Sequence, residues 1–177
     1  MKMDKTYEVE ATLGTTSTTG DPEGQLSVQS GAVPSIDEVR QVLEQYTGEQ
    51  QQIPPIFSAI KIDGKRAYKL AREGREVTIE PRTVTIRMIS EVSYDYPKLS
   101  FTTNVSSGTY IRSLVSDIGQ SLGVGAFTSG LRRQSINGYG IDDSFRLENA
   151  PEGQEAAFIL QHLQSQDNEA GSAQEAS

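Results

Sequence analysis

Apolar and polar residues alternate strictly from Lys5 to Leu13. The apolar positions of this run are Tyr7, Val9, Ala11 and Leu13. Successive side chains of an extended chain point to opposite faces, so a period of two places all four on one face. The pattern therefore predicts a strand with one buried face over Lys5–Leu13.

Later runs rich in β-branched and aromatic residues are also typical of strands. We expect three long strands at Arg82–Tyr94, Lys98–Val105 and Ala126–Ile136, and two short ones at Phe57–Ile62 and Val77–Ile79. The Asn137-Gly138 pair signals a tight turn. The segment Gly14–Gly24, rich in Thr, Ser and Gly, is expected to be a loop.

Helical spacing occurs in two places. The first helix is expected to start at a capping box made by Ser35 and Glu38 and to end at Gly48, with its apolar face formed by Ile36, Val39, Leu43 and Tyr46. The second is expected to take Thr109 as its N-cap and to end at Gly123, with its apolar face formed by Ile111, Leu114, Val115, Ile118 and Leu122. Ala67–Arg72 and Ala156–Leu163 are weaker helical segments.

Strands follow one another with few helices between them, which favours an α+β fold with a mixed, largely antiparallel sheet flanked by helices. One domain is expected over residues 1–147. Residues 148–177 are expected to form an acidic, mostly disordered tail, because they are polar and carry no Lys or Arg.

Arg112 falls in the first turn of the second helix. Positive charge there opposes the helix dipole, whose N-terminal end is itself positive. A residue that breaks a local rule often marks a functional site. We expect its carboxylate partner to lie outside the chain, and the pattern alone also allows a surface arginine.

Composition excludes several classes of site. The chain has no cysteine and one histidine, so disulfides, thiolate chemistry and multi-histidine metal sites are not expected. No apolar run reaches the roughly 18 residues of a membrane span, and no signal-peptide pattern opens the sequence. We expect a cytoplasmic protein without a metal or cofactor.

The net charge of −8 argues against a nucleic-acid partner, but its distribution does not. Lys61–Arg87 carries eight bases and four acids. Because salt limits the reach of distant charges to about 10 Å, this segment can contact phosphates despite the total charge. Charge alone leaves a solvated charged surface equally open.

Three collinear blocks resemble the TruB-type tRNA pseudouridine synthases. They are KTYEVEATLGTTSTTGDPEG from Lys5, IPPIFSAIKIDGKRAYKLAREG from Ile53, and GTYIRSLVSDIGQSLGVGAFTSGLRR from Gly108, and the resemblance spans roughly residues 4–147. It implies isomerisation of a tRNA T-loop uridine, whose base is detached from the sugar and rejoined through carbon. Extruding this base costs roughly a few kcal/mol.

The resemblance also implies roles for individual residues. Arg112 matches the arginine that pairs with the catalytic aspartate, and Tyr7 matches the tyrosine that stacks on the flipped base and assists proton transfer. Tyr110 and Leu131 match residues that contact the substrate, and basic side chains for the RNA backbone are Lys61, Lys65, Arg66, Lys69, Arg72, Arg132 and Arg133. Packing in a strand, at a helix start or in the core remains open for Tyr7, Tyr110 and Leu131, respectively.

The family's essential aspartate belongs to a G-x-L-D-P-type motif that precedes the first block, and this sequence contains no such motif. We therefore expect an N-terminally truncated catalytic domain that is inactive alone, with the missing N-terminal half as a separate chain as one option. The alternatives are a non-catalytic RNA-binding or tRNA-folding module, and a partly folded chain awaiting its other half.

Overall fold

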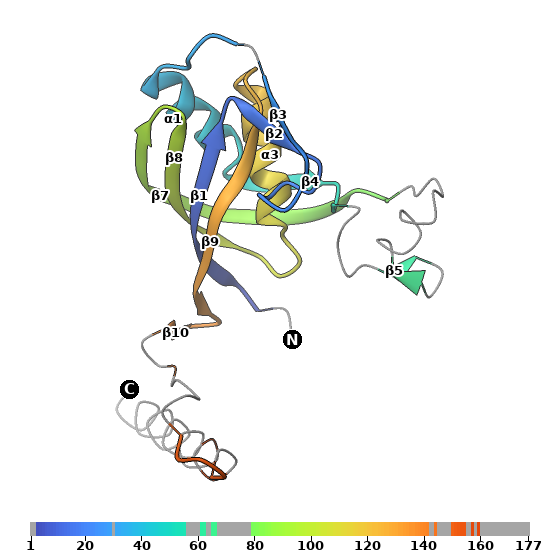
Figure 1. Ribbon diagram of the computed structural model, residues 1–177, viewed down its shortest axis with the longest axis vertical. Helices are drawn as coiled ribbons and strands as arrows, with labels where there is room; N and C mark the ends of the chain where they lie inside the picture. Colours follow the sequence, from blue (N-terminus) through green and yellow to red (C-terminus); the bar gives the residue numbers. More distant parts are fainter. Residues whose placement is uncertain are drawn as a thin grey trace. The chain divides into compact units, whose positions relative to one another are not determined.

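Strand β1 (Lys5–Leu13), the alternating segment, lies inside an antiparallel sheet (Figure 1). The computed structural model describes residues 3–29, 31–55, 61–62, 65–66, 79–141, 144, 150–154, 157 and 159. The chain divides into two compact units, Met1–Gly138 and Tyr139–Ser177. The predicted boundary after residue 147 stays a prediction.

The sheet of the first unit has the strand order β9-β1-β8-β7-β4. Its other strands are β4 (Gly48–Gln52), β7 (Arg82–Asp95), β8 (Lys98–Val105) and β9 (Ala126–Ile136). Every described pairing within it is antiparallel. The predicted α+β class with a largely antiparallel sheet is confirmed, and the three long strands lie where the sequence predicts them.

The sequence analysis did not predict three strands, two of which are made largely of polar residues. The Gly14–Gly24 segment is not wholly a loop, because β2 (Thr15–Ser17) pairs there with β3 (Leu26–Val28). Strand β4 reads Gly-Glu-Gln-Gln-Gln, without apolar alternation, and forms by pairing with β7. Backbone pairing with a neighbour therefore overrides the weak strand propensity of these segments.

Several predicted elements lie wholly or largely outside the described residues: Ala67–Arg72, Val77–Ile79, Ala156–Leu163 and most of Phe57–Ile62. Within the described part, two-residue strands β5 (Lys61–Ile62) and β6 (Lys65–Arg66) pair antiparallel. In the second unit, β10 (Tyr139–Gly140) follows Asn137 and Gly138, whose φ angles of 52° and 88° confirm the predicted tight turn.

Helix α1 (Ile36–Gln45) starts at Ser35 with both bonds of the predicted capping box. Helix α3 (Ile111–Ser121) is followed by Gly123 at a φ of +71°, as predicted. The predicted N-cap Thr109 is wrong: Tyr110 is the N-cap and makes no side-chain cap bond. Thr109 Oγ1 donates instead to the backbone oxygen of Ser106 at 2.9 Å, which closes the preceding turn.

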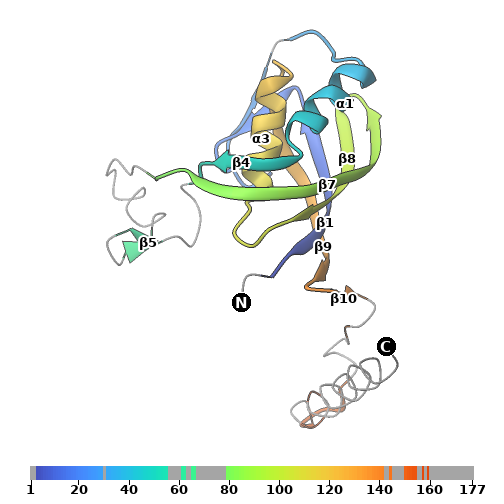
Figure 2. The same cartoon turned by 180° about the vertical axis from the view of Figure 1, so that it is seen from behind.

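Both helices lie on the same side of the sheet (Figure 2). The buried core beneath them combines both helices with alternate residues of the strands: Val9, Ala11, Leu13, Val39, Leu43, Ile86, Leu99, Phe101, Val105, Ile111, Leu114, Val115, Ile118, Val124 and Ala126. Each buried Val, Leu, Ile or Phe side chain in this core contributes roughly 1.5–3 kcal/mol. The apolar face predicted for β1 is therefore the core face, with Tyr7 partly buried at its edge. Neither described helix is long and apolar enough to cross a membrane.

Candidate functional site

Arg112 lies in the first turn of α3 and forms an ion pair with Asp21 through Nη1 and Oδ2. The same Nη1 donates to the backbone oxygen of Thr19 at 3.4 Å. The two charged side chains are 31% and 20% exposed, respectively, so water screens the pair only in part. The expectation that the partner of Arg112 lies outside the chain is therefore wrong for this contact.

Asp21 is held by the turn that follows β2. Thr19 Oγ1 donates to Asp21 Oδ1 at 2.5 Å, and Ser17 Oγ donates to the Asp21 backbone oxygen at 2.5 Å. Gly20 has a φ of +76°, and a Cβ there would lie 3.3 Å from the Cβ of Arg112. Glycine thus allows both the left-handed turn and the close approach to α3. The Thr128 amide donates to the Gly20 oxygen at 3.0 Å and ties the turn to β9.

The pKa of Asp21 is lowered from its ordinary value. Burial acts to raise this pKa, but hydrogen bonds from Thr19 and Arg112, together with the charge of Arg112, lower it further than burial raises it. Asp21 is therefore an ionised carboxylate at neutral pH. Sequence reasoning missed this role, although Asp21 stands in the first of the three family-like blocks.

A cavity of about 400 Å³ opens beside the ion pair. Its lining residues are Asp21, Pro22, Glu23, Arg112, Thr128, Ser129, Gly130 and Leu131. Leu131 is 48% exposed and adds an apolar wall next to the charges. An apolar wall with a few fixed polar groups is typical of pockets that bind small flat molecules or groups, including a nucleobase.

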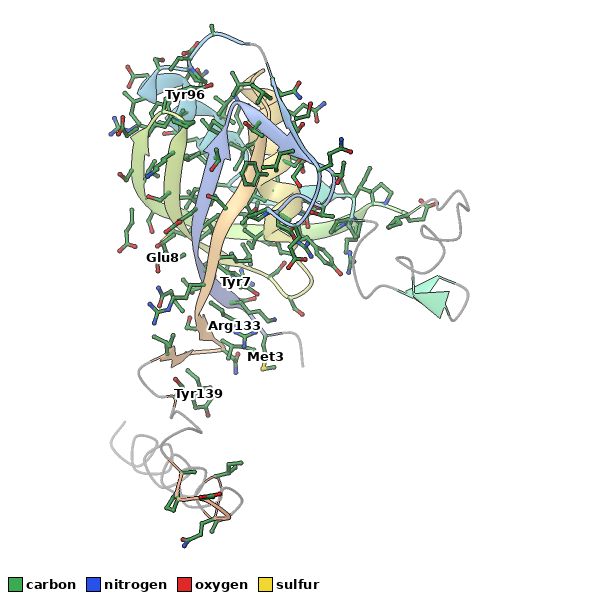
Figure 3. All side chains as sticks on the ribbon, in the orientation of Figure 1. Met3, Tyr7, Glu8, Tyr96, Arg133 and Tyr139 are labelled. Carbon is green, nitrogen blue, oxygen red and sulfur yellow. The ribbon has the colours of Figure 1, made fainter. Side chains whose placement is uncertain are left out.

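Tyr7 and Tyr110, predicted to contact substrate, are not among the lining residues of this cavity. Tyr7 packs against the core and pairs with Arg133 in the sheet register; Figure 3 shows the two residues near one end of β1 and β9. Leu131 pairs with Val9, so Tyr7 and Leu131 share one face of neighbouring strands. Tyr110 lies instead beneath the Arg82 guanidinium, whose Cζ is 5.1 Å from the ring centroid.

The predicted phosphate-binding residues separate into two groups. Arg132 and Arg133 are exposed on β9, and because they are consecutive in a strand they point to opposite faces. For Lys61, Lys65 and Arg66, the structure describes only the backbone of β5 and β6. Lys69 and Arg72 lie outside the described residues, so the prediction for the basic segment remains a prediction.

A larger cavity of about 750 Å³ lies on another side of Arg112. Asp117, Ser113, Gln120 and Pro54 contribute to its lining. Burial raises the pKa of Asp117, whose carboxylate has no hydrogen-bond or ion-pair partner among the described side chains. Arg112 and Asp117 therefore line the same cavity. Across the described chain, no group of three or more His, Asp or Glu side chains could hold a metal ion.

Comparison with known proteins gives a family match. The family model described as TruB family pseudouridylate synthase (N terminal domain) matches residues 1–111. The tRNA pseudouridine synthase B of Cupriavidus metallidurans is 42% identical over 147 residues, covering 82% of this chain and 47% of the relative. The protein of that name from Chlamydia trachomatis is 42% identical over 139 residues, covering 78% of this chain and 57% of the relative. The chain spans about half the length of these curated relatives.

Solved structures agree on the fold. A chain in the crystal structure of a Cbf5-Nop10-Gar1 complex superposes with a TM-score of 0.55 at 30% identity, covering 79% of this chain and 32% of that chain. A chain in the structure of an H/ACA RNP bound to a substrate RNA containing 2′-deoxyuridine gives a TM-score of 0.54 at 24% identity, covering 82% and 32%, respectively. The second match supports the fold alone.

Proposed function

Because the chain belongs to the TruB family of pseudouridylate synthases, we propose that it forms part of a cytoplasmic tRNA pseudouridine synthase. In this proposal the cavity of about 400 Å³ beside Arg112 receives a uridine extruded from the T-loop. The observation that carries the proposal is the convergence of the Arg112–Asp21 ion pair and exposed Leu131 on this one cavity.

The chemistry assigns a task to each part of the cavity. The bond from a uracil ring nitrogen to the sugar breaks, the ring turns, and a ring carbon forms the new bond and loses its proton, while the released nitrogen takes up a proton. Leu131 provides an apolar surface against the ring, and Tyr7 occupies the neighbouring position on the same sheet face. Stacking and apolar contact replace part of the base stacking lost on extrusion, worth roughly 1–3 kcal/mol for each base.

We do not assign the role of the reactive carboxylate to Asp21. Asp21 is already held by Arg112, Thr19 and the backbone of its own turn, which leaves it little freedom to reach a sugar carbon. We propose that a segment outside this sequence brings the attacking aspartate to the free side of Arg112. A guanidinium has five donors in a planar fork and can contact two carboxylates at once.

Binding to a T-loop hairpin RNA tests the cavity. Leu131→Ala is expected to weaken binding about tenfold, equivalent to about 1.4 kcal/mol, because it removes the apolar wall. Lys98→Ala is the matched control: it removes an exposed positive charge at the opposite end of β1 from Tyr7. Equal effects of the two substitutions, or no binding at low salt, would contradict the proposal.

Pseudouridine formation by the purified chain tests the assignment of the carboxylate. We expect no turnover without the second segment, and turnover that depends on Arg112 when that segment is added. Turnover by the chain alone that survives Arg112→Ala would contradict the assignment. If the chain binds the hairpin but gives no turnover either with or without the second segment, a non-catalytic RNA-binding module would instead be favoured.

A further inference from the structure

Gln52 is a buried polar side chain. It is the last residue of β4 and only 3% exposed. Its side-chain amide binds both backbone groups of one residue: Nε2 donates to the Tyr110 oxygen at 3.0 Å, and the Tyr110 amide donates to Oε1 at 2.7 Å. A glutamine is thus joined to Tyr110 much as one strand residue is joined to another.

Tyr110 is where α3 needs such a contact. The first amides of a helix have no intrahelical acceptor, and α3 has no side-chain cap of its own. The Tyr110 oxygen accepts the first helical bond from Leu114 at 3.1 Å, and Gln52 uses its remaining acceptor capacity. One residue further on, Ser113 Oγ donates to the Ile53 oxygen at 3.1 Å. Residues 52 and 53 therefore hold the first turn of α3 at two points.

We propose that Gln52 is a positioning residue, which fixes the first turn of α3 and thereby holds the Arg112 guanidinium against Asp21 at the edge of the cavity. Arg112 is the second residue of this helix, so a small rotation of the first turn displaces its long side chain. Its charge opposes the helix dipole, and the helix end alone does not favour its place. The effect on RNA binding rests on the proposed function, whereas the effect on Arg112 does not.

Two substitutions separate positioning from simple packing. Gln52→Met keeps a long unbranched side chain but loses both hydrogen bonds. Gln52→Glu keeps the shape, and its protonated form can again accept from the Tyr110 amide and donate to the Tyr110 oxygen, whereas the ionised form can only accept. Gln51→Met is the matched control, because Gln51 is exposed and its Nε2 donates to Thr83 Oγ1 of β7 at 2.8 Å and not to the backbone of Tyr110.

The direct readout is the titration of the Asp21 carboxyl carbon by NMR, together with hydrogen-exchange protection of the Tyr110 amide. In Gln52→Met we expect the Asp21 midpoint to rise toward that of an ordinary aspartate, and Tyr110 protection to fall at least tenfold, while amides of β1 and β8 keep theirs. Gln51→Met should match the wild type. Wild-type values for both readouts in a folded Gln52→Met variant would overturn the proposal.

The glutamate variant supplies a pH profile that packing alone would not give. Between pH 8 and pH 5, Tyr110 protection in Gln52→Glu, taken relative to wild type, should recover as residue 52 protonates, while Gln52→Met stays low. The other ionisable groups on the surrounding elements are Glu49 of β4, Arg82, Arg87, Glu91, Tyr94 and Asp95 of β7, Tyr110 at the helix start, and Arg112 and Asp117 of α3, and they are common to all variants. Identical pH profiles for the two variants would overturn the proposal; if Gln52→Met fails to fold, a Gln52→Glu profile that shows no recovery relative to wild type between pH 8 and pH 5 would overturn it.

Hairpin RNA binding separates this inference from the proposed function. We expect Gln52→Met to bind at least fivefold more weakly than Gln51→Met. If the wild type binds no RNA while the Asp21 and Tyr110 readouts change as expected, the proposed function fails and the positioning role stands. If the wild type binds and Gln52→Met binds as well as Gln51→Met, the placement of Arg112 by Gln52 does not contribute to RNA binding, and that part of the proposal is overturned.

Discussion

The two helix starts are stabilised from different places. At α1, Ser35 Oγ accepts from the Glu38 amide at 3.3 Å, and the Glu38 carboxylate accepts from the Ser35 amide at 2.7 Å, all within four residues. At α3, the cap bonds come from Gln52, which is 58 residues away in sequence. The first start is exposed and local, whereas the second is partly buried and depends on the edge strand β4 being in place.

Helix α1 needs only to form, whereas α3 must also lie at one defined position relative to the sheet. A local cap stabilises α1 wherever the helix lies, because both partners move with it. The Gln52 contact stabilises α3 only at one position relative to the sheet. Arg112, the residue with a proposed functional role, lies in the helix of the second kind.

The largest expected effect is the loss of the long-range cap. Gln52→Met should lower the free energy of unfolding by about 2–3 kcal/mol, because two hydrogen bonds are lost and the Tyr110 amide and oxygen lose a partner in a partly buried place. Urea unfolding followed by circular dichroism measures this loss. Gln51→Met should change the value by less than about 0.5 kcal/mol, as is usual for a surface position.

Loss of the local cap should have a smaller effect. Ser35→Ala should lower the free energy of unfolding by about 1 kcal/mol, because an orphan amide of α1 loses its acceptor. Ser35→Gly should lower it by only a few tenths of a kcal/mol, since glycine is itself tolerated at the N-cap. The same urea experiment decides, and an unchanged free energy of unfolding in Ser35→Ala would mean that the capping bond contributes little.

Substitution of Asp117 should stabilise the folded chain at neutral pH, whereas the preceding substitutions should destabilise it. Burial raises its pKa, so the folded chain binds its proton more tightly than the unfolded chain does. Its contribution to stability is therefore present in acid and lost as pH rises from the ordinary aspartate range through the raised pKa. Asp117→Asn should increase the midpoint temperature at pH 7 but not at pH 3, as measured by thermal unfolding. An unchanged midpoint at both pH values would argue against desolvation of this carboxylate.

The smallest expected effect is the acid response of the capping box. Hydrogen bonds from the backbone and side chain of Ser35 lower the pKa of Glu38. Because the folded pKa is depressed, the stabilisation is present above the ordinary glutamate pKa and lost as pH falls through the lowered value. Glu38→Gln should therefore flatten the dependence of stability on pH between about 5 and 3, in a series of urea titrations.

The sequence was sufficient to predict an element where the pattern that specifies it is local. The strands β1, β8 and β9 follow from residue alternation and β-branched runs, and the start of α1 follows from Ser35 and Glu38. It was insufficient where a polar residue acquires its role from a distant partner. Nothing near Gln52 signals that it caps a helix, and β4 around it has no apolar alternation. Thr109 is a good N-cap by type, but its hydroxyl is used by the preceding turn.

In the candidate site, too, some residues could be predicted from the sequence and a long-range contact could not. Arg112 could be singled out because its charge conflicts with its place in the helix, and Leu131 followed from the family resemblance. The ion pair with Asp21 was missed, because it joins residues 91 positions apart through a turn whose shape depends on Gly20. Tyr7 remains a prediction supported by its shared sheet face with Leu131.

The central place of β1 has a consequence for synthesis on the ribosome. This strand is translated well before its two hydrogen-bonding neighbours, β8 and β9. At ordinary elongation rates the delay until β9 is complete is on the order of ten seconds. Until β8 emerges, both edges of this half-apolar strand lack their partners, and the β9 edge lacks its partner until the interval ends, so the nascent strand stays open to pairing with other chains.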